Sequence, residues 1–188
     1  MKPLPPNRRH CLQLLAGALG GTWGSHALAR EATASPPAEA VGRLAPWPAR
    51  QATPALKALA LDGNRRSLSD FAGTPLILNF WATYCAPCRL EIPQFNQLLV
   101  RHQARGLRVL AVNHGEMPAR VLQFLQAVPF HGDVLLDRSQ TQLPAWGGMA
   151  LPTSFVIDAQ GRVRFWHMGE IDWLGADAQA ALQTVLQG

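Results

Sequence analysis

The sequence predicts an α/β fold in which a central mixed sheet is flanked by helices. Two continuous apolar runs of strand length, Leu76–Trp81 and Leu107–Val112, are typical of strands buried on both faces of a sheet. A helical pattern follows each run, and a hairpin and a last helix follow towards the C-terminus. This order predicts a sheet with parallel and antiparallel parts, covered by helices.

The first part of the domain is expected to be a β-hairpin. A tight-turn sequence, Asp62–Asn64, separates two short extended runs, Leu56–Leu61 and Arg65–Leu68. Ser69–Phe71 suggests a short helical turn after them. The buried strand Leu76–Trp81 comes next.

Two helices follow the buried strands. The first is predicted from about Pro87 to Ala104, and its apolar face carries Leu90, Phe95, Leu98 and Leu99. The strand Leu107–Val112 separates it from a second helix, Ala119–Val128. Pro118 opens that helix at a first-turn position, where its missing N–H group is tolerated.

The C-terminal part is predicted to add three strands and a helix. Val134–Leu136 is a short strand candidate, and Ser154–Asp158 and Arg162–Trp166 form a hairpin around the turn Ala159–Gly161. Ile171–Leu186 is expected to close the domain as a helix. We find no internal repeats.

Residues 1–29 have the features of a signal peptide. Such a signal combines a basic start, a short apolar stretch and small residues before the cut: Lys2, Arg8 and Arg9, then Leu12–Leu19, then Ala27–Ala29. The apolar stretch is too short to span a bilayer. The Sec and twin-arginine export routes both stay open, and an uncleaved N-terminus that acts as an anchor is the alternative.

Residues 30–53 are rich in Ala and Pro and lack an apolar period, so we expect a flexible spacer there. The remaining residues 54–188 suit one compact domain, since 48% of the 188 residues are hydrophobic. Three of the 17 basic residues fall in the signal, which leaves 14 against 12 acidic ones. This near-neutral balance gives no reason to expect nucleic acid as a partner.

One pair of cysteines remains after the signal, Cys85 and Cys88, because the third cysteine is Cys11. Structural disulfides in small exported proteins usually form several well-separated pairs, so chemistry explains this single C-x-x-C better. Cys85 falls where a buried strand ends and a helix begins, and the free N–H groups there favour a thiolate. Cys88 lies three residues on, on the same face, so the two sulfurs can join.

Half of a zinc site is the alternative for a C-x-x-C pair. Zinc requires two more ligands with a similar spacing. The histidines after the spacer are scattered without such a spacing: His102, His114, His131 and His167. We therefore expect no metal, and no cofactor beyond a redox-active Cys85–Cys88 disulfide.

Two blocks of sequence resemble the thioredoxin-like TlpA/ResA/DsbE group of exported thiol–disulfide oxidoreductases. They are LILNFWATYCAPCRLEIP at residues 76–93 and LPTSFVID at residues 151–158. The resemblance extends from about Leu56 to the C-terminus. It implies that residues 54–188 are a thioredoxin fold with an N-terminal β-hairpin extension and a central insertion. It also implies that Cys85 attacks a partner disulfide and that Cys88 resolves the mixed disulfide.

The resemblance further implies a cis peptide bond before Pro152, facing the disulfide. That bond would aim the Leu151 backbone at an incoming peptide for strand-like pairing, whereas an ordinary trans proline is the alternative. The residues expected to contact a client are Trp81, Tyr84, Pro87, Leu151 and Thr153. For Trp81, packing beneath the active-site turn is the first interpretation, and lining of the docking groove is the alternative.

Two positions distinguish the chain from ordinary cytosolic thioredoxin. Asn79 stands where thioredoxin has a buried aspartate that handles the proton of the second cysteine, and a neutral amide cannot do that. Glu91 lies three residues after Cys88 and matches the glutamate of the TlpA/ResA pattern. We hypothesise that Glu91 accepts the proton of Cys88 or tunes its pKa. A solvated helix carboxylate is the alternative.

The expected function is a periplasmic reductase that opens disulfides of specific client proteins, in cytochrome c maturation or in oxidase and copper-protein assembly. The resemblance implies a membrane electron donor of the DsbD/CcdA type. Thr153 stands where the cytochrome-maturation branch usually has Glu, which weakens a cytochrome-specific role. The alternatives are a thiol-based Cu(I) metallochaperone, which no Met or His cluster supports, and a broad disulfide oxidant.

Overall fold

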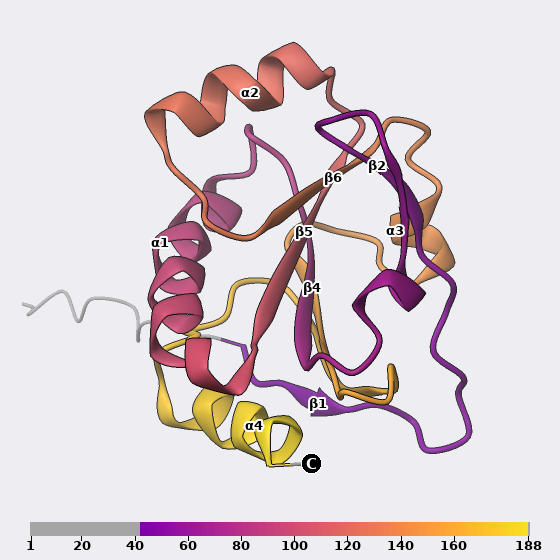
Figure 1. Cartoon of the computed structure of the whole chain (residues 1–188), viewed down its shortest axis with the longest axis vertical. Helices are drawn as coiled ribbons and strands as arrows, with labels where there is room; N and C mark the ends of the chain where they lie inside the picture. Colours follow the sequence, from indigo (N-terminus) through magenta and orange to yellow (C-terminus); the bar gives the residue numbers. More distant parts are fainter. Residues whose placement is uncertain (1–41, 188) are drawn as a thin grey trace, which may run out of the picture. The chain divides into compact units, whose positions relative to one another are not determined.

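In the part of the chain that the structure describes, eight strands form one mixed sheet in the order β1-β8-β7-β4-β5-β6-β2-β3 (Figure 1). The structure is a computed structural model and describes residues 42–187. The strands are β1 Ala45–Pro46, β2 Lys57–Ala60, β3 Arg65–Ser67, β4 Leu76–Trp81, β5 Arg108–His114, β6 Asp133–Asp137, β7 Thr153–Ile157 and β8 Val163–Met168. Strands β4, β5 and β6 are parallel, and every other neighbouring pair is antiparallel. The predicted mixed α/β architecture is confirmed.

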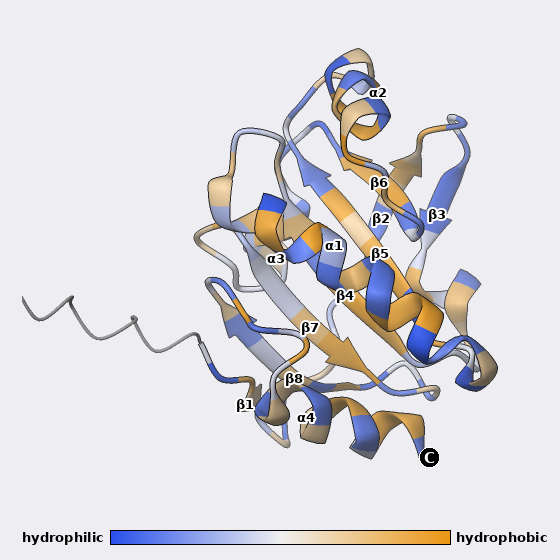
Figure 2. Ribbon diagram, turned by 90° about the vertical axis from the view of Figure 1, so that its left-hand side faces the viewer, coloured by the Kyte–Doolittle hydropathy of each residue, from blue (hydrophilic) through white to orange (hydrophobic). Residues whose placement is uncertain are grey.

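Within residues 42–187, four α-helices and two short 3₁₀ turns accompany the sheet. The helices are α1 Ala86–Arg101, α2 Pro118–Ala127, α3 Gln142–Ala145 and α4 Ala176–Leu186, and the 3₁₀ turns are Leu68–Phe71 and Gln103–Arg105. Hydrophobic residues colour much of the central strands β5 and β6 in Figure 2. The long apolar runs of the sequence are therefore strands buried within the sheet.

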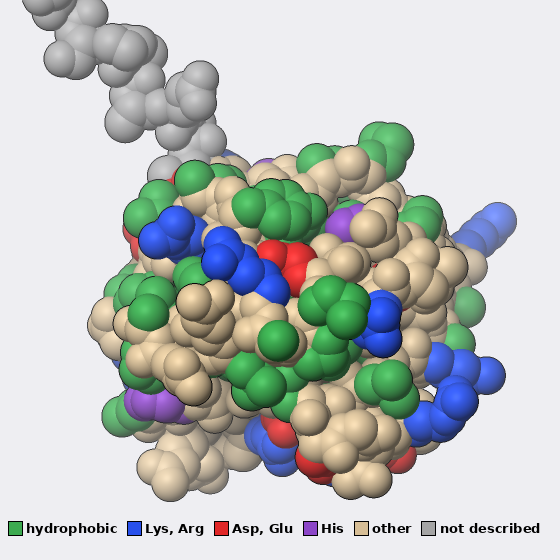
Figure 3. Space-filling model, turned by 90° about the horizontal axis from the view of Figure 1, so that it is seen from above, with side chains coloured by type: hydrophobic (Ala, Val, Ile, Leu, Met, Phe, Trp, Pro, Cys, Tyr) green, Lys and Arg blue, Asp and Glu red, His purple; other side chains and the backbone are tan. Residues whose placement is uncertain are grey.

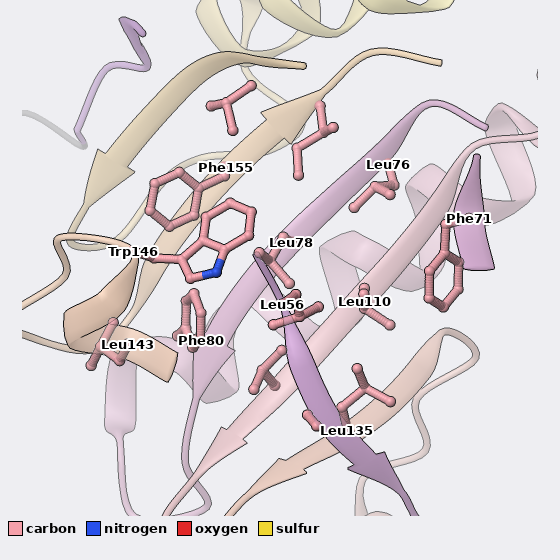
Figure 4. Close-up of a cluster of buried hydrophobic side chains, with 14 residues drawn as sticks. Leu56, Phe71, Leu76, Leu78, Phe80, Leu110, Leu135, Leu143, Trp146 and Phe155 are labelled. Carbon is pink, nitrogen blue, oxygen red and sulfur yellow. The ribbon is translucent and has the colours of Figure 1, made fainter. Parts of the chain in front are cut away.

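The side chains of β4 alternate between the two faces of the sheet, as strand geometry requires. Leu76, Leu78 and Phe80 point into one hydrophobic cluster, which also contains Trp146 and Phe155 (Figure 4). The intervening Ile77 and Trp81 belong to clusters that contain side chains of α1. Asn79 lies on the same face of β4 as Ile77 and Trp81. This polar residue of the central strand therefore faces α1.

Residues 42–53 differ from the prediction of a flexible spacer that lasts to residue 53. Strand β1 pairs with β8, and Trp47 packs edge-on against Phe155 and Trp166 with ring centroids 5.7 Å and 6.3 Å away. The packed region therefore begins before Pro54. The Pro-rich composition conceals this, because one tryptophan and two paired residues are enough to attach the segment to an existing sheet edge.

The last helix begins five residues later than the predicted start at Ile171. The N–H groups of Ile171 and Trp173 donate to the side chains of Glu91 and Gln94, at 3.0 Å and 2.7 Å. Both Ile171 and Trp173 are buried, so residues 171–175 fill a space beside α1 as a loop. The short helix α3 was not predicted either. The N–H group of Gln142, where α3 begins, donates to the carboxylate of Asp137 at 2.8 Å, a contact that the local sequence does not reveal.

The predicted signal peptide, residues 1–29, lies outside the described residues, as does the first part of the predicted spacer. Within residues 42–187, no helix combines the length and the apolar character that a bilayer crossing requires.

Candidate active site

The two cysteines form a disulfide at the N-terminus of α1. Cys85 is the N-cap residue of the helix, its Cα lies 5.3 Å from that of Cys88, and its sulfur accepts a hydrogen bond from the Cys88 N–H at 3.3 Å. Pro87 is in the first turn, where a helix does not need its missing N–H group. Cys85 is 8% exposed and Cys88 only 1%, so Cys85 is the sulfur that an incoming group reaches first.

The chain enters the helix through a tight turn at residues 82–85. The N–H group of Cys85 donates to the carbonyl of Ala82 at 3.2 Å, which makes Thr83 and Tyr84 the central residues of the turn. Thr83 is buried, whereas Tyr84 is 67% exposed. Trp81, just before the turn, is buried against Phe124, with ring centroids 5.5 Å apart. The turn therefore rests on an aromatic pair and presents one tyrosine to the surface.

The peptide bond between Leu151 and Pro152 is cis, as the resemblance implies. Leu151 packs against the hydrophobic cluster that contains both cysteines. Among the described residues, no hydrogen bond engages the main chain of Leu151. Its N–H and C=O groups are thus available beside the disulfide for a segment in extended conformation.

Glu91 is fully buried behind the cysteines, on the helix turn after Cys88. Its carboxyl oxygens accept hydrogen bonds from the Ile171 main-chain N–H at 3.0 Å and from Asn79 Nδ2 at 3.2 Å. Asn79 Nδ2 also donates to the hydroxyl of Ser154 at 2.9 Å. Glu91 is therefore linked to two strands of the sheet and to the loop before α4.

Burial raises the pKa of Glu91 to about 8, because a buried carboxylate loses its hydration. The hydrogen bonds from the Ile171 N–H and from Asn79 act in the opposite direction and lower the pKa, but they do not outweigh the loss of water. The carboxyl is consequently protonated in most molecules at pH 7. It is not the solvated helix carboxylate that the sequence left open.

A second carboxylate, Glu116, binds the turn in front of Cys85. It accepts hydrogen bonds from the Thr83 N–H at 2.7 Å and from the Thr83 hydroxyl at 2.6 Å. Asn113 Nδ2 donates to the same carboxylate at 2.7 Å, and Arg120 Nε donates to the Thr83 hydroxyl at 3.2 Å. The loop after β5 is in this way tied to the turn that leads into the disulfide.

The surface near the cysteines carries exposed apolar side chains. Tyr84, Met117 and Met149 are 67%, 57% and 87% exposed, and Met117 and Met149 lie next to Glu116 and two residues before Leu151. Figure 3, a view from the α2 side, shows hydrophobic side chains with acidic and basic ones among them. Within residues 42–187, no three His, Cys, Asp or Glu side chains gather in a way that could hold a metal ion.

Residues 49–166 match the model of the AhpC/TSA family. The chain belongs to this family. That stretch covers more than half of the chain and includes the two cysteines, Glu91, Glu116 and Pro152. The fold and the candidate site therefore lie within one family region.

Relatives and solved structures of similar sequence carry related names. The chain is 38% identical over 104 residues to the thiol-disulfide oxidoreductase ResA of Geobacillus thermodenitrificans, covering 55% of this chain and 60% of that protein. It is 35% identical over 102 residues to ResA of Bacillus subtilis, covering 54% of this chain and 57% of that protein. The chain thus spans about three fifths of the length of these relatives.

The fold agrees with solved thioredoxin-like structures. A putative thiol:disulfide interchange protein DsbE from Chlorobium tepidum superposes with a TM-score of 0.67 at 28% identity, over 78% of this chain and 99% of that one. A putative thioredoxin from Neisseria meningitidis gives a TM-score of 0.60 at 26% identity, over 69% and 89% of the two chains. The thioredoxin fold that the resemblance implies is confirmed.

Some of the predicted site residues lie around the disulfide in the structure, and others do not. Cys85, Cys88, Pro87 and Leu151 lie around the disulfide, and Tyr84 projects beside it. Trp81 is buried beneath the turn, in agreement with the packing interpretation and not with contact to a client. Thr153 was expected to contact a client but is buried, and its hydroxyl donates to the Ala150 carbonyl at 2.6 Å. Neither side chain is presented to a client in this structure.

The sequence did not single out Glu116, Thr83 or the link from Asn79 to Glu91. Asn79 was noted only as a missing aspartate, and its hydrogen bond to Glu91 crosses from strand to helix. One signal was available: Asn79 and Ser154 are polar residues inside apolar strands, and they face each other in the β4–β7 register. For Glu116, the polar run Asn113–Glu116 after a buried strand indicates a loop at the end of the sheet. It does not indicate that Glu116 binds Thr83.

Proposed function

We propose that this chain is a thiol–disulfide oxidoreductase that reduces disulfides of exported client proteins. One observation carries the proposal: a Cys85–Cys88 disulfide caps α1, beside a cis-proline segment whose Leu151 main chain is free. The helix N-terminus stabilises a thiolate at Cys85, and Leu151 offers hydrogen bonds to an extended client segment. The names of the relatives agree with this chemistry.

The exchange takes place in two steps. The Cys85 thiolate attacks a client disulfide, so that a bond forms between Cys85 and one client sulfur while the other client sulfur leaves as a thiolate. Cys88 then loses its proton and attacks the Cys85 sulfur, which forms the Cys85–Cys88 disulfide and releases the second client thiolate. Two electrons pass to the client, whose two thiolates take up two protons.

Glu91 is proposed to exchange the proton of Cys88. Its pKa of about 8 lies close to the ordinary value of a cysteine thiol, about 8.5. A group whose pKa is near that of its partner and near the working pH can both take and return a proton. Glu91 lies on the same helix as Cys88, three residues further on, within the buried region behind the disulfide.

The oxidised pair must be reduced again before another cycle. A dithiol donor at the membrane, of the DsbD/CcdA type, is proposed to do this after export of the chain to the periplasm. The clients are proposed to be apocytochrome c or cysteine-bearing proteins of oxidase and copper-site assembly. The basic start, apolar stretch and Ala27–Ala29 pattern of residues 1–29 support export.

Reduction of insulin by dithiothreitol tests the activity, because catalysed cleavage of the interchain disulfides makes the solution turbid. The chain is expected to accelerate it, and a Cys85→Ser, Cys88→Ser variant is not. Equilibration against glutathione and dithiothreitol then fixes the direction. A reduction potential near the reducing end of the range for such pairs, about −270 mV, supports a reductase, whereas a value near −120 mV indicates an oxidant.

A copper titration of the reduced protein separates the enzyme from a metallochaperone. The enzyme is expected to turn over insulin and to bind Cu(I) only weakly. Tight copper binding without turnover contradicts the proposed function.

A further inference from the structure

The carboxylate of Glu116 holds the turn that leads into Cys85. It binds Thr83 twice, since it accepts from the main-chain N–H and from the hydroxyl at 2.7 Å and 2.6 Å. Thr83 is one of the two central residues of the 82–85 turn, and Cys85 ends that turn. Glu116 therefore contacts Thr83, whose conformation helps to set the position of Cys85.

The carboxylate is itself anchored to the sheet. Asn113 Nδ2 donates to it at 2.7 Å, and the Glu116 N–H donates back to Asn113 Oδ1 at 3.2 Å. Asn113 is buried in β5, where it pairs in register with Trp81, the residue at the end of β4. Glu116 thus connects two neighbouring strand ends through side chains, beyond the last main-chain pair of β4 and β5.

No other hydrogen bond among the described residues engages the Thr83 N–H. Because Thr83 is buried, removal of the carboxylate leaves that N–H without a partner unless the turn moves to reach water. The movement falls on Tyr84 and Cys85, which follow directly. The rest of the sheet keeps its main-chain hydrogen bonds.

We propose that Glu116 is a positioning residue for thiol–disulfide exchange: by holding Thr83, it keeps Cys85 at the N-terminus of α1 and Tyr84 on the surface while Cys85 changes its bonding partner. This inference rests on the proposed function. Glu116 acts through Thr83 and not as a proton carrier, because both of its carboxyl oxygens are occupied by donors from the protein.

Position and charge have opposite effects on the Cys85 thiol. A negative charge nearby disfavours the thiolate, so loss of the charge alone lowers the pKa of Cys85. A helix N-terminus favours the thiolate, so displacement of Cys85 from the helix end raises that pKa. The sign of the change in a Glu116 variant therefore distinguishes the two roles.

Two variants separate them, Glu116→Ala and Glu116→Gln. In Glu116→Gln, the amide oxygen can accept from the Thr83 N–H and from Asn113, and the amide nitrogen can donate to the Thr83 hydroxyl. This variant loses the charge but keeps the contacts. The matched control is Asp177→Ala, which removes a carboxylate from α4 that is exposed and pairs with Arg43.

The measurements are the KM and kcat for insulin reduction and the pH dependence of Cys85 alkylation by iodoacetamide in the reduced protein. Glu116→Ala is expected to raise the KM roughly fivefold to tenfold and to raise the midpoint pH of alkylation, consistent with loss of a charge-assisted hydrogen bond. Glu116→Gln is expected to keep the KM within about twofold of wild type, without a rise in the midpoint.

The proposal is overturned if Glu116→Ala leaves either readout unchanged, if it lowers the midpoint, or if Glu116→Gln behaves like Glu116→Ala. Wild-type protein without turnover contradicts the proposed function instead, so the two failures are distinguishable. If Glu116→Ala does not fold, as judged by circular dichroism, Thr83→Val takes its place. It removes the hydroxyl contacts with Glu116 and Arg120 but keeps the bond from the Thr83 N–H to Glu116. A smaller rise in both readouts is expected, and Thr83→Ser is expected to return both to the wild-type values.

Discussion

Two carboxylates in the region of the cysteine pair have different environments. Glu91 lies behind the disulfide, fully buried, with two hydrogen-bond donors and a pKa raised to about 8. Glu116 binds the turn that precedes Cys85 and is partly exposed. It accepts three hydrogen bonds from Thr83 and Asn113. The same side chain is therefore suited to proton exchange in one place and to holding a turn in the other.

The difference follows from hydration and from the number of donors. A carboxylate that accepts three hydrogen bonds from protein donors is held in place by them and holds its donors in turn. A carboxylate without water gains more from binding a proton. The number of carboxylates near a thiol thus says little about their roles until the burial of each one is known.

The largest effect is expected from removal of the two cysteines, on which both carboxylates are proposed to act. Cys85→Ser with Cys88→Ser is expected to reduce the protein-catalysed rate of insulin reduction, measured above the background of dithiothreitol alone, by more than about 1,000-fold, since no nucleophilic thiol remains in the protein. Single variants add detail: Cys88→Ser is expected to accumulate a mixed disulfide with the client, detectable by mass spectrometry. Accumulation with Cys85→Ser instead would reverse the roles of the two sulfurs.

Replacing each glutamate by glutamine sharpens the comparison. Glu91→Gln is expected to slow release of the client from the mixed disulfide about tenfold to a hundredfold, because the amide cannot exchange the proton of Cys88. Glu116→Gln serves as the matched control and is expected to stay near wild type. Rapid-quench measurement of client release checks both variants. Equal rates in the two variants would show that burial does not separate their roles.

Protein stability is expected to depend on pH through Glu91. Its pKa is near 4.5 in an unfolded chain and about 8 in the folded one, so the folded state binds more protons between these values. The free energy of unfolding of the oxidised protein should therefore be highest below about pH 4.5 as far as this group is concerned, and should fall as the pH rises towards 8.

The expected loss from Glu91 between pH 5 and pH 8 is at least about 1 kcal/mol. Urea unfolding at several pH values measures it, and Glu91→Gln is expected to flatten the profile. A slope that survives in Glu91→Gln would assign the pH dependence to other groups.

The smallest expected effect concerns the independence of the two networks. Glu116→Ala combined with Thr83→Val is expected to be non-additive by about 1 kcal/mol in the free energy of unfolding, because each change alone already removes the contact between Glu116 and the Thr83 hydroxyl. Glu116→Ala combined with Glu91→Gln should be additive within about 0.5 kcal/mol. Strong coupling in the second pair would mean that the two carboxylates form one network.

The sequence predicted what depends on local pattern or on the family blocks. The apolar run at residues 76–81, the helix after Cys85 and the cis bond before Pro152 are all found in the structure. The interactions that were missed are non-local. Asn79 lies 12 residues from Glu91 along the chain, and Thr83 lies 33 residues from Glu116.

The errors at residues 42–53 and 171–175 have a related cause. Both segments have a composition or periodicity that suggests one structure, but each is fixed by side-chain contacts with another part of the sheet or with α1. Trp47 rests on Phe155, and the N–H groups of Ile171 and Trp173 bind side chains of α1. Propensity alone cannot anticipate a partner that is distant in the sequence.

The two outermost strands of the sheet bear on solubility. Strand β1 has two residues, one of them Pro46, which lacks an N–H group, and β3 has three residues, two of which are Arg65 and Arg66. Edge strands that are short, charged or contain proline offer few backbone groups for pairing with a strand of another molecule. They therefore oppose self-association and fibril growth. Among residues 42–187, the main chain of Leu151 next to the disulfide stays free of hydrogen bonds, and it is where the proposed function places an extended client segment.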